Sequence, residues 1–483
     1  MQLEDQDLWR TQAYVDGNWI DADDGATNAV SNPSSGESIA EIAKCGTAET
    51  RRAIEAAQAA QPAWRALPAK TRGHFLRRLF DLTVEHQEDL ARIMTLEQGK
   101  PLAESRGEIT YGANFLEWFA EEAKRMYGDT IPGPTPSTRI VVVREPVGVV
   151  ACITPWNFPN AMLTRKIGPA LASGCTVVCK PANATPLSAL AIAELADRAG
   201  IPPGVVNVLA GRTAEIGAEL TENPLVRKLT FTGSTEVGKD LIRACADTVK
   251  RTSMELGGNA PFMVFDDADI DAAVEGAIAS KYRNAGQTCV CSNRFLVQAG
   301  VYDQFAEKMA AQVKAMKMGD GFSEDVSIGP LIDEGAANVV HSMIENATEL
   351  GATAVVGGYR SDLGGSFVPP TVLTDVTDKM RVFNEEIFGP VAPLIKFDSD
   401  EEGVALANKT EFGLAAYFYA RDMGRIWRVA EALEYGIVGI NEGLVSNETA
   451  PFGGMKESGN GREGSKYGLD EYTEIKYLCM GGI

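Results

Sequence analysis

Histidine is the scarcest residue with versatile chemistry in this chain, because only His74, His86 and His341 occur among 483 residues. None of them belongs to an HxxxH or HxxEH pattern or lies beside a cysteine pair, so no metal site is predicted. All three lie in patterns typical of helix surfaces. A Cys–His or Ser–His–Asp catalyst would have to recruit one of them, so the sequence favours a carboxylate as any catalytic base.

Basic residues are also under-represented, with 45 Lys and Arg against 66 Asp and Glu and a formal net charge of -21. A surface of this sign repels phosphate backbones, which argues against a nucleic-acid partner. The most apolar region, 140–153, is interrupted by Arg144, Glu145 and Pro146, whereas a membrane span needs about 18 apolar residues. The acidic start lacks the features of a secretory signal or a transit peptide, so a cytoplasmic location is expected.

The eight cysteines are too few for a disulfide framework in a chain of this length. Cys175 and Cys179 flank the strand-like run Thr-Val-Val and are predicted to lie in a core. Cys289 and Cys291 are the only close pair outside such a strand. Either these two form a reversible disulfide that blocks a reactive thiol, or Cys291 is a packing residue.

The order of apolar runs predicts the fold. A chain of 483 residues should form two or three domains. Residues 47–127 have the pattern of amphipathic helices, and strands and helices then alternate from Gly148 at the spacing of βαβ units. A second alternating set begins at Ala260, so we expect two doubly wound, Rossmann-like α/β domains with a boundary near Glu255. The tail 471–480 alternates like a strand that pairs with another element or subunit. The main expected strands are 148–153, 174–180, 205–209, 226–232, 260–265, 294–298, 353–356, 371–373, 392–397, 415–419 and 436–441.

The segment from Gly233 to Lys239 matches GxxxxGK at the start of a predicted helix. A phosphate loop needs Ser or Thr next, where this chain has Asp240, and the GxGxxG pattern of dinucleotide sites is missing. Gly233 and Ser234 could still bind a pyrophosphate through free N–H groups at the helix start. A plain strand-to-helix turn is the equal alternative.

Four polar residues at predicted turns each have a functional and an ordinary interpretation. Cys289 follows a helix-like segment and a Gly-Gln break, where it is either a nucleophile or a packing thiol. Glu255, which precedes Leu-Gly-Gly, is either a catalytic base or a surface carboxylate. Asn157, in a turn bracketed by prolines, either donates an N–H to an oxyanion or completes the turn. Lys180 ends a strand, where it holds ribose or phosphate oxygens or stays solvated.

Seven short motifs follow one another along the chain: Pro155-Trp-Asn-Phe-Pro159, Lys180-Pro-Ala, Phe231-Thr-Gly-Ser234, Glu255-Leu-Gly-Gly258, Gly286-Gln-Thr-Cys289, Glu385-Glu-Ile-Phe-Gly-Pro390 and Pro451-Phe-Gly-Gly454. In this order, and over nearly the whole chain, they resemble the aldehyde dehydrogenase superfamily. Within the superfamily, the segments 283–291 and 461–468 are most similar to those of succinate-semialdehyde dehydrogenases.

The resemblance implies a role for each matching position. Cys289 would be the nucleophile and Glu255 the base, with Asn157 and the Cys289 backbone N–H forming the oxyanion hole. Oxidation would then proceed through a thiohemiacetal and a thioester, with hydride passing to NAD(P). The implied cofactor-binding positions are Trp156, Asn157, Lys180, Pro181, Ala182, Asn183, Gly233, Ser234, Leu256, Glu386 and Phe388.

The resemblance also implies a substrate and a cofactor preference. Arg165, Arg283 and Ser446 match positions that hold a substrate carboxylate, which suits succinic semialdehyde. Glutaric semialdehyde, one methylene longer, or a broader range of aldehydes is the alternative. Family members that prefer NAD often carry an acid where this chain has Asn183, three residues after Lys180. We therefore expect NADP to be preferred or at least accepted, with NAD possible.

Three structural parts follow from the resemblance. They are a cofactor-binding domain of residues 1–127 and 145–254, a catalytic domain of residues 255–455, and an oligomerisation element of residues 128–144 and 456–483. The last part predicts a homo-oligomer, either a dimer or a tetramer. Two other functions compete with a dehydrogenase: a kinase built on the GxxxxGK segment, and a non-catalytic structural oligomer of the same fold.

Overall fold

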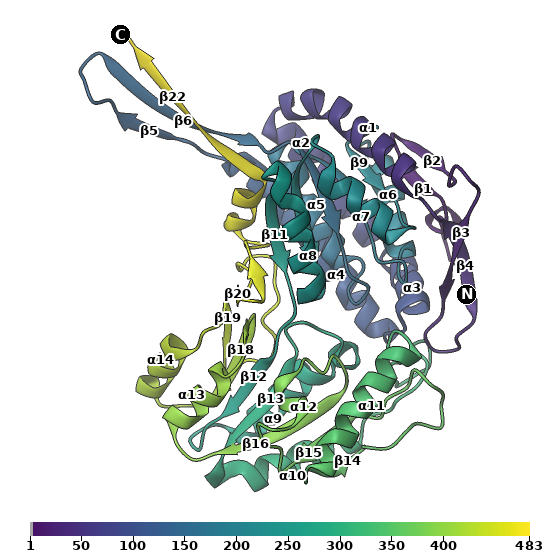
Figure 1. The fold of residues 1–483 in the computed structure, drawn as a ribbon, viewed down its shortest axis with the longest axis vertical. Helices are drawn as coiled ribbons and strands as arrows, with labels where there is room; N and C mark the ends of the chain where they lie inside the picture. Colours follow the sequence, from purple (N-terminus) through teal and green to yellow (C-terminus); the bar gives the residue numbers. More distant parts are fainter. Residues whose placement is uncertain (1–2) are drawn as a thin grey trace.

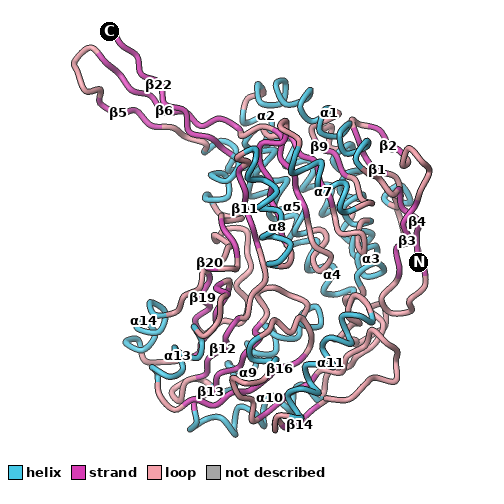
Figure 2. Tube along the Cα trace, in the orientation of Figure 1, coloured by secondary structure: helices cyan, strands magenta, loops and turns pink. Residues whose placement is uncertain are grey.

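The computed structural model describes residues 3–483, which form two α/β bodies and a long β arm with the C-terminus near its tip (Figure 1). Helices and strands alternate through both bodies (Figure 2), so the predicted fold class is confirmed. None of the helices within the described residues combines the length and the apolar character that crossing a bilayer requires.

The first body is built on an eight-stranded sheet with the order β2-β1-β9-β8-β7-β10-β11-β21. The five strands from β9 to β11 run parallel to one another. Helices α1, α7 and α8 pack mainly on one face and α2 to α6 on the other, so the central strands are continuous apolar runs. The strands are β1 (Ala13–Val15), β2 (Asn18–Ile20), β7 (Val149–Ile153), β8 (Thr176–Lys180), β9 (Val206–Val208), β10 (Val226–Thr232), β11 (Arg251–Glu255) and β21 (Gly459–Asn460). The helices are α1 (Thr47–Ala66), α2 (Ala69–Glu85), α3 (Gln87–Gln98), α4 (Leu102–Glu122), α5 (Ala161–Ser173), α6 (Leu187–Arg198), α7 (Thr213–Glu222) and α8 (Thr235–Cys245).

The second body is built on a seven-stranded sheet with the order β14-β15-β16-β13-β12-β18-β19. All neighbouring strands are parallel except the edge strand β14, which pairs antiparallel with β15. Its strands are β12 (Ala260–Val264), β13 (Ser292–Gln298), β14 (Thr353–Val356), β15 (Thr371–Thr374), β16 (Val391–Phe397), β18 (Ala415–Tyr419) and β19 (Ile437–Ile440). Its helices are α9 (Ile270–Tyr282), α10 (Tyr302–Lys314), α11 (Glu334–Glu349), α12 (Arg381–Asn384), α13 (Asp400–Asn408) and α14 (Met423–Ala432).

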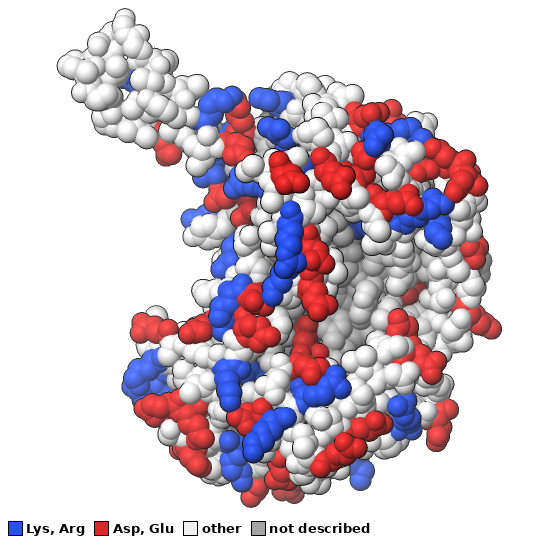
Figure 3. Space-filling view, viewed as in Figure 1, with Lys and Arg blue, Asp and Glu red and all other residues white. Residues whose placement is uncertain are grey.

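The arm consists of β5 (Asp129–Pro132), β6 (Thr138–Pro146) and β22 (Thr473–Gly481). The C-terminal strand pairs antiparallel with β6 along its whole length, so the predicted tail strand has found its partner within the chain. Apolar side chains on β22 are nevertheless exposed, with Ile475 68% and Tyr477 59% accessible. On the face shown in Figure 3 the arm carries little charge, whereas both bodies are covered with acidic and basic residues.

Several features of the structure differ from what the sequence predicted. The strands β1, β2, β3 (Thr27–Ser31) and β4 (Ser38–Ala43) were not expected before α1, and β11 was not expected after α8. His341 is buried in α11 with 5% exposure, so the expectation that all three histidines lie on helix surfaces is wrong for this one. Residues 459–460 pair with β11 in the first sheet rather than with the arm. The small strands β17 (Phe412–Gly413) and β20 (Met455–Lys456) form a separate pair.

The core of the second body contains a fully buried arginine, Arg294 on β13. Its guanidinium donates hydrogen bonds to the carbonyl oxygens of Asn259, Leu406 and Ala407 at distances from 2.8 to 3.2 Å. It also donates to the hydroxyl of Tyr435 at 3.1 Å. Arg294 therefore ties β13 to the loop before β12 and to the end of α13.

We expect the substitution Arg294→Met to destabilise the protein by roughly 3 kcal/mol or more. Each buried carbonyl left without a donor costs about 1–3 kcal/mol, and methionine fills the space without replacing a hydrogen bond. The midpoint of thermal unfolding measures this effect. Arg77→Met is the matched control, because its exposed side chain makes surface ion pairs and lies over the Phe80 ring rather than bonding buried carbonyl groups. Equal midpoints for the two variants would contradict the structural role of Arg294.

Candidate active site

A cavity of about 250 Å³ lies where the carboxyl ends of β7, β10 and β11 face the second body. This edge of a doubly wound sheet is where such folds bind ligands. The cavity brings together nine of the predicted residues from segments far apart in the sequence. They are Trp156, Asn157, Gly233, Ser234, Glu255, Leu256, Cys289, Glu386 and Phe388. Pro155, Phe158, Met162, Thr232 and Gly257 complete the lining.

The thiol of Cys289 reaches this cavity because the chain reverses sharply after α9. Asn284, Ala285 and Gly286 have φ values of 52°, 53° and 76°, in the left-handed region. A side chain at Gly286 would place its Cβ 2.2 Å from the carbonyl oxygen of Gly389, so only glycine fits there. Burial, and secondarily the charge of Glu386, raise the pKa of Cys289 to about 12. The thiol must therefore lose a tightly held proton before it can attack a substrate.

Glu255 is the last residue of β11 and is 3% exposed. Neither of its carboxylate oxygens has a hydrogen-bond partner among the described residues. Burial, reinforced by the negative charge of Glu463, raises the pKa of Glu255 well above its ordinary value, although Arg165 and Lys166 oppose the shift. A carboxylate with raised pKa, facing a cavity and free of partners, has the properties of a general base.

Asn157 lies in the turn after β7 and is 5% exposed. Its side-chain Nδ2 donates to the carbonyl oxygen of Gln287, 3.0 Å away in the turn that precedes Cys289. An amide nitrogen carries two hydrogens, so one N–H of Asn157 remains for another acceptor. The amide therefore lies in the same cavity as the Cys289 thiol with one donor available.

The residues around this cavity fit a nicotinamide dinucleotide. Trp156 and Phe388 pack edge to face with ring centroids 5.5 Å apart, giving an apolar wall. Burial raises the pKa of Glu386 to about 7, and its Oε1 accepts the backbone N–H of Gly258 at 3.1 Å. A Cβ on Gly233 would lie 2.3 Å from the ring of Phe231, so the backbone at the start of α8 stays bare for a phosphate.

Lys180, Pro181, Ala182 and Asn183 lie outside the cavity, at the carboxyl end of β8 beside β7. Burial lowers the pKa of Lys180 to about 8, and its Nζ donates to the carbonyl oxygen of Pro181 at 3.2 Å. The amide of Asn183 makes two hydrogen bonds with the backbone of Gly211, of 2.7 and 3.1 Å. Asn183 therefore braces the loop after β9 and has little free hydrogen-bonding capacity.

A second cavity of about 240 Å³ lies on the other side of Phe158, which lines both spaces. Arg283 and Ser446 both face it, and the guanidinium carbon of Arg283 lies 5.3 Å from the centroid of the Phe158 ring. The remaining lining residues were not predicted from the sequence: Lys100, Glu104, Gly107, Glu108 and Tyr111. They lie on or just before the first turns of α4, and only the Gly-Lys-Pro break between α3 and α4 marks this place in the sequence.

Arg165 does not line this second cavity. It is 1% exposed, and its Nε lies 2.6 Å from a carboxylate oxygen of Glu463. Its guanidinium carbon lies 4.1 Å from the ring centroid of Phe452, while its Nη2 has no partner within the described chain. The three predicted carboxylate ligands are thus divided, with Arg283 and Ser446 together and Arg165 apart from them.

The contacts of Cys291 and of the GxxxxGK segment bear on two further predictions from the sequence. The sulfur of Cys291 is buried and lies 3.4 Å from Nζ of Lys281 on α9, so the thiol packs against that helix. A disulfide with Cys289 stays a prediction. Lys239 of the GxxxxGK segment forms an exposed ion pair with Glu457, and Asp240 pairs with Arg243. Lys239 is thus engaged on the surface, which does not favour the kinase alternative.

The carboxyl edge of a doubly wound sheet is where such folds bind dinucleotides, and the Cys289 thiol, the Glu255 carboxylate and the Asn157 amide all face the cavity at this edge. The model of the aldehyde dehydrogenase family matches residues 19–478, and the chain belongs to this family. The protein is therefore an NAD(P)-dependent aldehyde dehydrogenase. Family membership argues against the kinase, and the presence of Cys289, Glu255 and Asn157 in one cavity argues against a non-catalytic oligomer.

Individual relatives are similar over their whole length. The chain is 62% identical over 483 residues to the glutarate-semialdehyde dehydrogenase of Pseudomonas aeruginosa, covering 100% of both chains. It is 60% identical over 481 residues to the NADP(+)-linked succinate-semialdehyde dehydrogenase of Escherichia coli K12, again covering 100% of both. The crystal structure of succinate-semialdehyde dehydrogenase from Burkholderia pseudomallei superimposes with a TM-score of 0.99 at 60% identity, covering 100% of each chain.

The raised pKa of Cys289 predicts a particular pH dependence of alkylation. Only the thiolate reacts, so without cofactor or substrate the rate with iodoacetamide should rise about tenfold per pH unit from 7 to 10. The exposed Cys479 is first replaced by serine to remove its signal. A second variant with Cys289→Ser added gives the background rate. A plateau reached by pH 8 would show that the pKa of Cys289 is not raised.

Proposed function

We propose that this protein oxidises succinic semialdehyde to succinate, with NADP as the preferred hydride acceptor. The observation that carries this proposal is the pairing of two cavities across Phe158. One cavity holds the thiol, and the other holds a guanidinium and a hydroxyl from Arg283 and Ser446. A small molecule with an aldehyde at one end and a carboxylate at the other matches this arrangement, since guanidinium groups bind carboxylates strongly.

The chain's own residues would perform the reaction in a fixed order. Glu255 first takes the thiol proton of Cys289 and releases it to solvent, and the thiolate attacks the aldehyde carbon. The remaining N–H of Asn157, with the Cys289 backbone N–H, holds the developing negative oxygen. When bound, the dinucleotide supplies the acceptor for the hydride that leaves this carbon, and a thioester remains on Cys289. Glu255 then removes a proton from a water molecule that hydrolyses the thioester.

Glutaric semialdehyde is the second candidate substrate. The Pseudomonas aeruginosa relative that carries this activity in its name is 62% identical to the chain. The two compounds differ by one methylene, which changes discrimination by only about 1–3 kcal/mol. Succinic semialdehyde is favoured because the residues of segment 283–291 resemble those of succinate-semialdehyde dehydrogenases.

The preference for NADP rests on the residues around Lys180. Asn183 offers no negative charge that would repel a 2′-phosphate, and its amide is engaged with Gly211 rather than free to grip a ribose diol. The lysine lies at the same strand end. The Escherichia coli relative is named as an NADP(+) enzyme, which supports the same choice.

We further propose a function for each part of the chain and an assembly of two or four subunits. Residues 1–127 and 145–254 would bind the cofactor, and residues 255–455 would carry the nucleophile. Residues 128–144 and 456–483, apart from 459–460 in the first sheet, would join subunits into a dimer or tetramer. The support for the last assignment is the arm, whose strand β22 exposes Ile475, Tyr477 and other apolar side chains that a second copy would cover.

The substitution Arg283→Ala should lower kcat/KM for succinic semialdehyde by roughly 30- to 150-fold. This loss corresponds to the ~2–3 kcal/mol of a charge-assisted pair with the substrate carboxylate. Oxidation of butanal, which lacks the carboxylate, should change little. Arg360→Ala, on the exposed surface, is the matched control. If Arg283→Ala oxidises succinic semialdehyde as well as the parent, the assignment of the second cavity is wrong.

The parent enzyme should show a kcat/KM for NADP equal to or above that for NAD at saturating succinic semialdehyde. Replacing Asn183 by Asp should lower the value for NADP more than that for NAD, because the new charge repels the 2′-phosphate. Steady-state rates with both cofactors provide the measurement. A strong preference of the parent for NAD would refute the proposed cofactor choice.

A further inference from the structure

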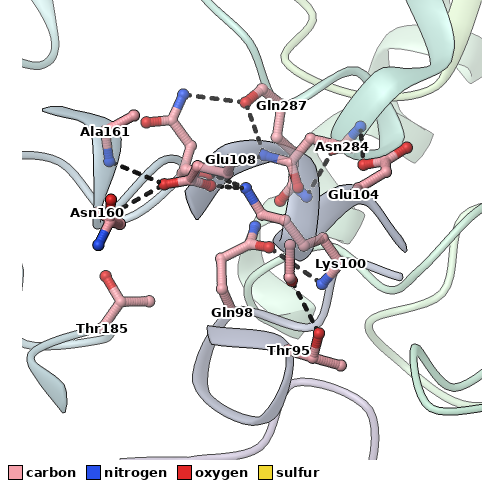
Figure 4. Close-up of polar contacts among 12 residues, drawn as sticks. Thr95, Gln98, Lys100, Glu104, Glu108, Asn160, Ala161, Thr185, Asn284 and Gln287 are labelled. Atoms are coloured by element: carbon pink, nitrogen blue, oxygen red, sulfur yellow. Dashed lines mark hydrogen bonds and ion pairs between the residues drawn. The ribbon is translucent and has the colours of Figure 1, made fainter. Parts of the chain in front are cut away.

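The backbone carbonyl oxygen of Asn157 is the meeting point of a buried hydrogen-bond network. It accepts one bond from Nζ of Lys100 at 2.7 Å and another from Nδ2 of Asn284 at 2.9 Å. Figure 4 shows these donors arriving from different segments, with Lys100 beside Glu108 and Asn284 beside Gln287. Both lone pairs of one carbonyl are therefore used, which fixes the peptide plane of Asn157.

Lys100 is held in place from two further sides. Its ammonium group lies 2.5 Å from Oε2 of Glu108 and 4.0 Å from the ring centroid of Phe158, and the residue is 2% exposed. The other oxygen of Glu108 accepts the backbone N–H groups of Asn160 and Ala161 at 3.0 and 3.2 Å, where α5 begins. Lys100 therefore bonds to the turn at Asn157, and its partner Glu108 bonds to the end of the same turn at Asn160 and Ala161.

Asn284 extends the network to the turn that carries the thiol. Its Nδ2 also lies 3.2 Å from the carbonyl oxygen of Gln287, the same oxygen that accepts the side chain of Asn157. Its backbone N–H donates to Oε2 of Glu104 at 2.8 Å, and it adopts a left-handed φ of 52°. The turns of Asn157 and Cys289 are therefore connected by hydrogen bonds on one side and anchored to α4 on the other.

Stability alone does not account for a buried ammonium at this position. Replacing a buried ion pair by well-packed apolar residues is often neutral or stabilising, because desolvation offsets much of the attraction. An apolar residue at position 100 could not donate to the Asn157 carbonyl. A shift of about 1 Å in a group that stabilises a transition state can lower a rate by a factor on the order of 10².

We propose that Lys100 is a positioning residue, which sets the orientation of the Asn157 amide toward the oxyanion through the Asn157 backbone carbonyl. The inference rests on the proposed role of Asn157 in holding that oxyanion. Lys100 also lines the second cavity, where an ammonium could instead bind the substrate carboxylate. These two roles make opposite predictions for an aldehyde that lacks an acid group.

The first experiment compares Lys100→Met with Lys250→Met in the full-length protein. Lys250 is the matched control, because it is also buried and donates to a backbone carbonyl, that of Asn223 at 2.8 Å. The first-turnover rate of NADPH formation at saturating aldehyde should fall about 10- to 100-fold in Lys100→Met, equally with propanal and succinic semialdehyde. The KM for NADP should stay unchanged, and Lys250→Met should react like the parent. A loss confined to the KM for succinic semialdehyde would overturn the proposal and make Lys100 a carboxylate ligand.

The double variant Lys100→Met with Glu108→Gln separates positioning from charge balance. It removes the carboxylate that the single variant leaves unpaired, so the thermal midpoint should recover toward that of the parent while the first-turnover rate stays low. Recovery of the rate together with the midpoint would overturn the proposal, because Lys100 would then only neutralise Glu108.

A double-mutant cycle with Asn157→Ala tests whether Lys100 acts through Asn157. If it does, Lys100→Met should cost nothing further in the Asn157→Ala background, because the amide that it positions is gone. Losses that multiply would overturn the inference and leave the proposed function intact. An unchanged rate in Asn157→Ala alone would remove the assignment of the oxyanion amide, and the inference with it.

Discussion

The proposed chemistry depends on two turns from different bodies, which a few buried hydrogen bonds hold in a fixed relative position. The amide of Asn157 donates to the carbonyl oxygen of Gln287, and Asn284 donates to the carbonyl oxygen of Asn157. Contacts between domains of one chain commonly permit relative motion. Here the two bodies are hydrogen-bonded beside the cavity that Cys289 and Asn157 both line, so motion elsewhere in the interface need not separate these two residues.

The sequence was sufficient for elements whose buried side chains form continuous apolar runs. The buried run of β18 has the expected bounds, and the alternation of strands and helices gave the doubly wound arrangement. Strand β11 was not predicted because its sequence, Arg-Thr-Ser-Met-Glu, is mostly polar. It pairs with the short edge strand β21. The strands before α1 are short and partly exposed, so they carry no clear period. Tertiary packing decided their conformation where local propensity did not.

The residues of the site could be named from motifs, but their partners could not. Local patterns placed Cys289 and Asn157 at turns, and the cavity contains both. They could not show that the amide of Asn183 is engaged by Gly211, 28 residues away. Nor could they show that Lys100 reaches the Asn157 carbonyl from 57 residues away. Such contacts depend on how separate elements pack, which is a property of the whole fold.

The buried carboxylates of Glu255 and Glu463 show how their surroundings shift two pKa values in opposite directions. Glu255 and Glu463 are each 3% exposed, so loss of hydration acts on both. Arg165 and Lys166 lie 2.6 Å from the oxygens of Glu463, and no cation contacts Glu255 among the described residues. Although burial pushes the pKa of Glu463 upward, Lys166 and Arg165 hold it below its ordinary value, while burial and the negative charge of Glu463 raise that of Glu255. The basicity of Glu255 is therefore set first by its burial and second by the negative charge of Glu463, which Arg165 and Lys166 keep ionised.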